Sequence, residues 1–280
     1  MDYEAELDAA IEAGAAGIEA MADYRGDHRV ADGTESKENI NDLVTAADHA
    51  SQDAILDVLG ERFPDDTIVG EEGTGETLAR EGREWIVDPI DGTANFATGF
   101  PYYCVSIALA VDGASQVGVV VSPPAALDRL WYGVRGEGAF VHDGVAGIGG
   151  VEDLDGLSLS VTEQDELPGA FVFGRLSERH ADRRQIDWDV ASALLDRDSK
   201  FRRVGSAALN LCQVASGHAD GYVVLSLQEW DVAAGTLLVE EAGGRVRKRP
   251  ARVEDDSIEV IASNGHLQSE LEAIVDETVE

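Results

Sequence analysis

The segment that most constrains this chain is residues 84–96, which reads EWIVDPIDGTANF. Its apolar start predicts a buried β-strand that ends at Val87, because short runs of bulky apolar residues are typical of strands. Asp88 and Asp91 follow at once, and the Gly-Thr pair after them suits a tight turn that opens a helix. We therefore expect two carboxylates close together beside the backbone N–H groups of a helix start. Carboxylates bind hard cations and helix-start N–H groups bind phosphate oxygens, so this segment predicts a metal and phosphate site.

The chain is strongly acidic, with 55 Asp and Glu against 21 Lys and Arg and a formal net charge of −34. So much like charge strains a compact fold in dilute buffer and is screened in concentrated salt, which predicts a salt-adapted protein. The same charge argues against nucleic acid as a partner, because phosphate backbones are bound by basic patches. We expect most of these acids to be solvated surface residues, so an acidic residue is not by itself evidence for a metal ligand.

The length of 280 residues allows one large domain or two closely packed halves. Four glycines over residues 144–150 mark a boundary, which predicts halves over 1–145 and 146–280. No apolar run approaches the roughly 20 residues that cross a bilayer, and the acidic N-terminus lacks the features of a signal peptide. We therefore expect a cytoplasmic protein that does not enter a membrane. Cys104 and Cys212 lie in apolar surroundings, which favours buried thiols over a disulfide.

Hydrophobic periodicity predicts an α/β protein with an N-terminal α+β half and a C-terminal α/β half. The elements predicted for the N-terminal half are helices over 2–23 and 44–60, the second capped by Thr45, a mobile loop over 24–40, a strand over 67–69, and an antiparallel meander of strands over 104–111, 116–122, 129–134 and 138–142. Those predicted for the C-terminal half are strands over 158–161, 170–174, 201–204, 221–225 and 258–262, which alternate with helices over 178–195, 206–215, 230–241 and 267–275.

Two further stretches carry acids in suggestive surroundings. Glu71 and Glu72 lie between glycines at the end of the strand over 67–69, where they form either a solvated turn or a cation site at the edge of a sheet. Asp231 lies at a helix start in the sequence EWDVAAG, where it could simply stabilise the helix. The small residues that follow it allow close packing, so the carboxylate would be buried and would need a partner such as a metal.

Taken together, in this order and spacing, these stretches resemble the inositol monophosphatase family, which also includes fructose-1,6-bisphosphatases and adenosine bisphosphate nucleotidases. The sequence DPIDGT at 88–93, followed by Asn-Phe, carries most of the resemblance, and GEE at 70–72, WDVAAG at 230–235 and DLVTAAD at 42–48 add to it. The similarity runs from about residue 37 to 265. It implies the layered αβαβα sugar-phosphatase fold with a site between the two halves. With the acidic composition, it points to a halophilic archaeon as the source.

The resemblance also implies how the metals are bound. It implies two or three Mg²⁺ ions, and Mg²⁺ prefers carboxylate, carbonyl and water oxygens. The implied ligands are the carboxylates of Glu71, Asp88, Asp91 and Asp231 and the carbonyl oxygen of Ile90.

Roles for the neighbouring residues follow from the same resemblance. Gly92 and Thr93 would offer backbone N–H groups to the substrate phosphate. Thr93 and Asp48 would orient and deprotonate the attacking water, and Glu71 is counted with them as catalytic. The resemblance further implies that Glu72 assists a weaker metal, that Lys37 is a basic residue near the metals, and that Asp42 is structural.

The substrate pocket departs from the inositol-selective members of the family. Those members carry a Glu six residues before the Trp of the second motif, where this chain has Val224, so selectivity for inositol is not expected. Arg202 or Arg203, with Arg175 as a further candidate, could pair with a distal phosphate, or they could join surface ion pairs. The residues that align with sugar-contacting positions of the family are Ser206, Ala207 and Asp220.

These observations predict a Mg²⁺-dependent phosphomonoesterase for a small sugar or polyol phosphate, such as inositol 1-phosphate or fructose 1,6-bisphosphate. The alternatives are a 3′(2′),5′-bisphosphate nucleotidase of the same family and a noncatalytic metal-binding relative. Many members of the family are homodimers and are inhibited by lithium, and both traits are implied here.

Overall fold

The computed structural model describes residues 3–24, 37–73, 78–177 and 181–279, which form one seven-stranded and one five-stranded β-sheet. The helices are α1 (Glu4–Ala22), α2 (Lys37–Arg62), α3 (Thr93–Thr98), α4 (Ala181–Leu195), α5 (Ala207–Ala215), α6 (Ala233–Glu241) and α7 (Gln268–Thr278), with a 3₁₀ turn at Val151–Asp153. The strands of the first sheet are β1 (Thr67–Gly70), β2 (Arg83–Asp91), β3 (Cys104–Val111), β4 (Ala114–Ser122), β5 (Arg129–Val134), β6 (Gly138–Asp143) and β7 (Leu157–Ser158). Those of the second are β8 (Phe171–Gly174), β9 (Lys200–Arg202), β10 (Gly221–Leu227), β11 (Arg245–Pro250) and β12 (Ile258–Ser263).

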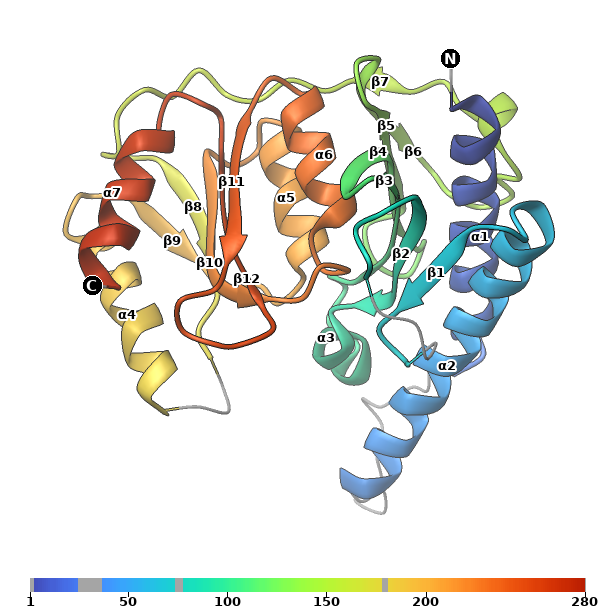
Figure 1. Cartoon of the computed structure of the whole chain (residues 1–280). Coiled ribbons are helices and arrows are strands. Elements are labelled where there is room, and N and C mark those ends of the chain that lie inside the picture. Colours follow the sequence, from blue (N-terminus) through green and yellow to red (C-terminus); the bar gives the residue numbers. More distant parts are fainter. Residues whose placement is uncertain (1–2, 25–36, 74–77, 178–180, 280) are drawn as a thin grey trace.

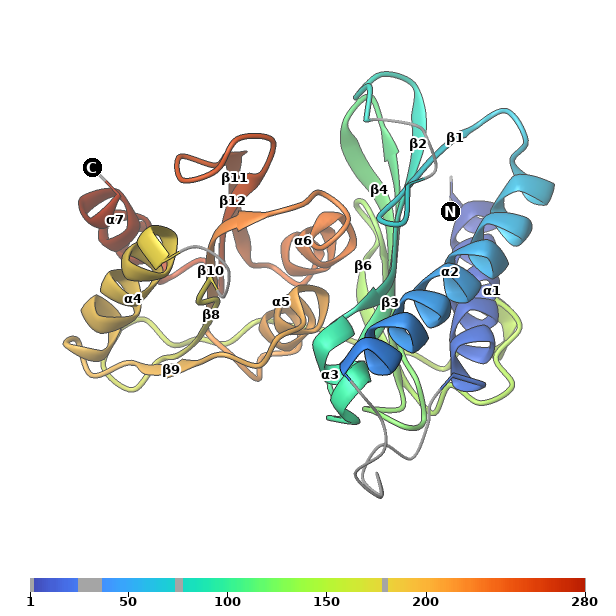
Figure 2. The ribbon, with the colours of Figure 1, turned by 90° about the horizontal axis from the view of Figure 1, so that it is seen from below.

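Helix pairs and sheets alternate in five layers (Figures 1 and 2). Helices α1 and α2 pack together on one face of the seven-stranded sheet, and α5 and α6 lie between the two sheets. Helices α4 and α7 cover the outer face of the five-stranded sheet. Three apolar cores fill the spaces: one surrounds α5 and α6 between the two sheets, one lies between the first sheet and α1 and α2, and one lies between the second sheet and α4 and α7. The predicted αβαβα arrangement is confirmed.

The first sheet follows the chain from β1 to β7. β1 pairs with β2 in parallel and every later neighbour is antiparallel, so the predicted meander is confirmed. The second sheet is mixed, in the order β11-β12-β10-β8-β9. Because β7 pairs with β6, the first sheet extends past residue 146, and the division of the chain at 145 stays a prediction.

Strand β2 is longer than the sequence predicts, because it continues past Val87 to Asp91. Its pairing with β3 shifts register between Asp88 and Asp91. This irregularity accommodates Pro89, which has no N–H group to donate. The Pro89 carbonyl accepts a hydrogen bond from the Ser51 hydroxyl of α2 at 2.9 Å. The two acids therefore lie inside the strand rather than after it.

Helix α2 also differs from its prediction. It begins at Lys37 rather than at residue 44, so Thr45 lies inside the helix and is not its cap. Residues 37–40 of the predicted loop are helical, and residues 25–36 of that loop lie outside the described residues. The first residues of the helix are polar and show no apolar periodicity, so the sequence pattern does not predict where the helix begins.

The sequence did not predict strand β11, which reads RVRKRP. Arg247 and Arg249 from this strand and Arg252 after it surround Glu259, whose side chain is 1% exposed, and also bond Asp276. A buried carboxylate is costly unless it is paired and hydrogen-bonded, and these arginines supply both.

Close packing of α6 against the first sheet depends on Gly118. A Cβ atom at this position would lie 2.9 Å from the Ala234 carbonyl oxygen and 3.2 Å from the Ala234 Cα, and backbone atoms cannot rotate away. We expect Gly118→Ala to lower the free energy of unfolding by about 1–3 kcal/mol. Gly60→Ala on α2, where a Cβ would meet nothing within 4 Å, is the matched control and should raise it by about 0.5–1 kcal/mol. Urea unfolding of both variants is the measurement, and equal stability would contradict the packing argument.

None of the helices in the described residues is both long enough and apolar enough to cross a bilayer.

Candidate metal site between the two halves

Three carboxylates converge where the first sheet meets the helix layer of α5 and α6. Asp88 and Asp91 come from β2, and Asp231 comes from the segment that leads into α6. One oxygen of each lies within 4.8 Å of one oxygen of each of the others. Asp88 and Asp91 are 1% and 6% exposed, so this group is largely shielded from water. The structure therefore brings together acids that are separated by 140 residues along the chain.

The N-terminus of α5 holds Asp91 in place. The Ser206 hydroxyl and the backbone N–H of Ala208 each donate to one carboxylate oxygen at 2.6 Å, and the N–H of Ala207 donates to the other at 3.1 Å. The Ser206 hydroxyl also accepts from the Leu209 N–H and so caps the helix. A helix N-terminus stabilises negative charge, which compensates part of the burial of Asp91. Ser206 and Ala207, which were expected to contact a sugar, thus contact a candidate metal ligand.

Local backbone bonds orient the other two carboxylates. Asp88 accepts a hydrogen bond from the N–H of Ile90 at 3.0 Å, and Asp231 accepts one from the N–H of Gln228 at 2.7 Å. The hydroxyl of Thr93 donates to the Ile90 carbonyl at 3.1 Å. This bond orients the Ile90 carbonyl oxygen, which is a further candidate metal ligand.

The carboxylate group is electrostatically unfavourable in the absence of a cation. Burial raises the pKa of Asp88 well above its usual range, and the charges of Glu71, Asp91 and Asp231 raise it further. Burial also raises the pKa of Asp91, although its hydrogen bonds oppose the rise. Burial and then the charge of Asp91 raise the pKa of Asp231 to about 7. Such a cluster needs protons or a cation to neutralise it, and its ligands are the hard oxygens that Mg²⁺ prefers.

Asp48 and Glu71 lie beside this cluster. Burial raises the pKa of Glu71 to about 7, against the effect of a hydrogen bond with Asp88. Asp48 of α2 is 4% exposed, and its Oδ1 atom has no hydrogen-bond partner among the described residues. Burial, followed by the charges of Glu71 and Glu72, raises its pKa to about 8. A buried polar atom without a partner needs an explanation, and a bound ion or water at this position supplies one.

The start of α3 adds a backbone feature to the site. Gly92 has φ of 101°, and a Cβ there would lie 3.0 Å from the Tyr102 carbonyl oxygen, so glycine is required. The helix begins at Thr93, and its first internal bonds run from the N–H groups of Asn95 and Phe96 to the Gly92 carbonyl.

Sequence reasoning missed two residues that support the site. The Gln52 side chain accepts from the N–H of Glu72 at 3.0 Å and so fixes the turn after β1. Its position four residues after Asp48 on the same helix was the available signal. The Asn95 side chain donates to the carbonyls of Tyr102 and Val204 at 2.7 and 2.9 Å, which ties α3 to the C-terminal half. No local pattern reveals the second of these contacts.

The structure gives the predicted substrate-binding residues Arg202, Arg203 and Asp220 different surroundings from those of Ser206 and Ala207. The guanidinium of Arg202 lies 5.2 Å from the centre of the Phe171 ring, and Arg203 is exposed just after the edge strand β9. Asp220 is buried and accepts bonds from the Thr162 hydroxyl at 2.5 Å and the Phe171 N–H at 2.6 Å, which favours a structural role.

Val224 is buried in β10. The side chains of Lys37 and Asp42 lie outside the described part of the structure.

Comparison with known proteins gives a consistent result. The model of the inositol monophosphatase family matches residues 2–280. The chain is 38% identical to "Inositol monophosphatase 3" of Solanum lycopersicum over 81% of each protein. It is 39% identical to "Nus factor SuhB" of Pasteurella multocida over 74% of this chain and 72% of that protein. The solved structure of an inositol monophosphatase from Anabaena superposes with a TM-score of 0.78 and 30% identity, covering 99% of this chain and 97% of that one.

Proposed function

Because this chain belongs to the inositol monophosphatase family, we propose that it is a Mg²⁺-dependent phosphomonoesterase that hydrolyses a small sugar or polyol phosphate. The observation that carries the proposal is the convergence of Asp88, Asp91 and Asp231, three carboxylates with oxygens within 4.8 Å of one another, near an Asp48 oxygen that has no hydrogen-bond partner among the described residues. Phosphate monoesters hydrolyse very slowly without catalysis. A cation bound by these carboxylates would neutralise the negative phosphate charge that opposes the reaction.

In the proposed site, two or three Mg²⁺ ions would be held by the carboxylates of Glu71, Asp88, Asp91 and Asp231 and by the carbonyl of Ile90. Bound Mg²⁺ would supply activation of water and neutralisation of phosphate charge. The hydrogen bonds from α5 to Asp91 and from Gln228 to Asp231 keep these carboxylates aimed at a common point.

The remaining roles belong to residues of α2 and α3. Asp48 accepts the proton of the attacking water, because its Oδ1 atom, which has no partner among the described residues, is an available acceptor. The Thr93 hydroxyl, anchored on the Ile90 carbonyl, positions that water. The N–H groups of Gly92 and Thr93 bind phosphate oxygens at the start of the helix.

The substrate class is tested by a panel of phosphate esters. Phosphate release should require Mg²⁺ and should be fastest with inositol 1-phosphate, fructose 1,6-bisphosphate or a glycerol phosphate. Preference for adenosine 3′,5′-bisphosphate would favour the nucleotidase instead. Absence of release from every ester in Mg²⁺, with measurable Mg²⁺ binding, would favour a noncatalytic metal-binding relative.

We also propose that the protein works in concentrated salt, as the net charge of −34 predicts. We expect the melting temperature to rise between 0.1 M and 2 M KCl by at least ten degrees, because salt screens the self-repulsion of surface carboxylates. Thermal unfolding monitored by circular dichroism is the measurement. A melting temperature that is the same at both concentrations would contradict salt adaptation and the halophilic source proposed with it.

A cytoplasmic location, inhibition by lithium and a homodimer stay predictions.

A further inference from the structure

The turn between β10 and α6 carries Asp231, and hydrogen bonds close it from both directions. The Asp231 carboxylate accepts from the N–H of Gln228 at 2.7 Å. The Glu229 carbonyl accepts from the N–H groups of Val232 and Ala233 at 3.2 and 2.9 Å. Because these bonds span the turn, it forms one closed unit, and a displacement of Glu229 also displaces the carboxylate of Asp231.

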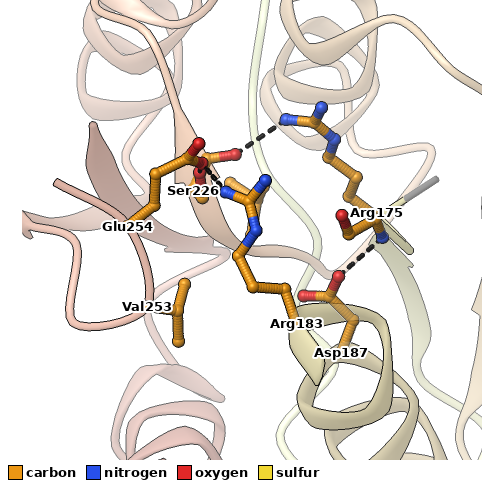
Figure 3. Close-up of a pocket in the computed structure, with 8 residues that line it drawn as sticks. Arg175, Arg183, Asp187, Ser226, Val253 and Glu254 are labelled. Carbon is orange, nitrogen blue, oxygen red and sulfur yellow. Dashed lines mark hydrogen bonds and ion pairs between the residues drawn. The ribbon is translucent and has the colours of Figure 1, made fainter. Parts of the chain in front are cut away.

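The strand that leads into this turn is held at Ser226 (Figure 3). The Ser226 carbonyl accepts from Nη1 of Arg175 at 2.8 Å, and its hydroxyl contacts the carboxylate of Glu254. Ser226 lies two residues before Gln228, so these contacts fix the end of β10 and not the orientation of the turn that follows. The orientation of the turn depends on contacts of its own.

The Glu229 side chain supplies such contacts, because its carboxylate lies between two cationic groups. The Lys248 Nζ donates to Oε1 at 2.5 Å, and Nη2 of Arg80 lies 3.7 Å from Oε2. The Glu229 side chain is only 11% exposed, and its Oε2 atom has no hydrogen-bond partner among the described residues. Separating a largely buried carboxylate from its cationic partner is costly, so Glu229 is held beside Lys248.

Strand β11 presents Lys248 to the turn because side chains alternate between the two faces of a strand. Arg247 and Arg249 bond Asp276 of α7 and therefore face the outer helix layer. Lys248, between them, faces the opposite side of the sheet, where α5 and α6 lie (Figure 1). This lysine is thus directed toward the start of α6 rather than toward the arginine cluster around Glu259.

Arg80 reaches Glu229 from the first sheet. It lies in the connection between β1 and β2, and the Glu84 carboxylate of β2 accepts from the N–H groups of Ala79 and Arg80 at 2.7 and 3.0 Å. Glu84 is 2% exposed, so this part of the connection is anchored on a buried residue. The Glu229 carboxylate therefore contacts residues tied to each of the two sheets.

We propose that Glu229 and Lys248 are positioning residues for the candidate metal site. Their ion pair holds the turn so that the Asp231 carboxylate points toward Asp88 and Asp91, and both residues act through Asp231. The proposal deepens the proposed function and rests on its metal site. Replacing a residue that orients a metal ligand lowers metal affinity by about 10–100-fold, so the pair should have a measurable effect on Mg²⁺ binding.

Calorimetric Mg²⁺ affinities separate positioning from long-range charge. Lys248→Met removes a positive charge and Glu229→Gln a negative one, so charge alone would raise the affinity in the first variant and lower it in the second. Positioning predicts a loss of about tenfold in both. The double variant has the net charge of the unmodified protein and leaves no buried carboxylate unpaired, so it should fold and still lose about tenfold.

Two further lysine variants complete the comparison. Lys248→Arg keeps the positive charge and should retain most of the affinity. Lys200→Met changes an exposed lysine on β9, at the opposite edge of the same sheet, and should leave the affinity unchanged. In the double variant, the Mg²⁺ concentration for half-maximal phosphate release should rise by the same factor as the affinity falls. The KM for the ester at saturating Mg²⁺ should stay the same.

Amide hydrogen exchange in EDTA reports on the turn without metal. The N–H groups of Val232 and Ala233, which bond the Glu229 carbonyl, should exchange faster in both single variants and in the double variant, whereas those of β3 should not change. If the unmodified protein neither binds Mg²⁺ nor hydrolyses an ester but exchange rises in the variants, the phosphatase is overturned and the positioning of the turn holds. If Mg²⁺ binds and the double variant keeps both its affinity and its exchange rates, the positioning role is overturned.

Discussion

Asp88→Asn is expected to reduce Mg²⁺-dependent phosphate release by about 10²–10³-fold, the cost of removing one group that stabilises charge in a transition state. Asp88 is 1% exposed and belongs to the group with Asp91 and Asp231, so an amide there removes the charge of a proposed ligand and keeps the shape of the side chain. Initial rates of phosphate release across a Mg²⁺ titration are the measurement. An unchanged rate would contradict the assignment of Asp88 as a ligand.

A stability measurement on the same variant distinguishes loss of a ligand from loss of the fold. Without metal, the Asp88 carboxylate lies among like charges, so Asp88→Asn should leave the melting temperature in EDTA unchanged or raise it. The gain in melting temperature on adding Mg²⁺ should be much smaller than in the unmodified protein. Asp143→Asn, an exposed acid paired with Arg129, is the control and should change neither activity nor the response to Mg²⁺.

Stability of the metal-free protein is expected to fall as the pH rises from about 4 to about 8. The folded protein holds the pKa of Asp48 at about 8 and those of Glu71 and Asp231 at about 7, whereas the ordinary values are 3.8, 4.5 and 3.8. Over that window the folded state binds more protons than the unfolded state, so each rise in pH favours unfolding. Mg²⁺ binds the deprotonated carboxylates, so its stabilising effect should grow over the same window.

Melting temperatures at pH 5 and pH 8, in EDTA and in Mg²⁺, check this expectation. The decline between the two pH values should be larger in EDTA, and Asp48→Asn should reduce it, because one buried titrating group is removed. Asp57→Asn, at an exposed position of the same helix, should leave the decline unchanged. Equal declines with and without Mg²⁺ would show that the buried carboxylates do not cause the pH dependence.

The fold was largely predictable from the sequence because most elements have local signals. The strands at Cys104–Val111 and Arg129–Val134 have the predicted bounds, since bulky apolar residues between turn signals define them. Strand β11 has no such signal, and its arginines are tolerated because Glu259 and Asp276 lie opposite them in space. The start of α2 and the continuation of β2 through Pro89 depend likewise on contacts that the local sequence does not contain.

The candidate site, like the fold, was only partly predictable from the sequence. Spacing predicted that Asp88 and Asp91 would lie close together, and the family resemblance implied that Asp231 would join them; the structure places one oxygen of each within 4.8 Å of the others. The partners of Asp91 could not be predicted, because Ser206 and Ala208 are more than 110 residues away in sequence.

The hydrogen bonds from α5 to Asp91 tie the candidate metal site to the helix layer between the two sheets. Asp91 of the first sheet is oriented by α5, while Asp231 is carried by the segment that leads into α6. A change in how α5 and α6 pack against the first sheet would therefore disorient Asp91 and move Asp231 at the same time. Cation binding at this cluster would therefore be coupled to the packing of the middle helix layer.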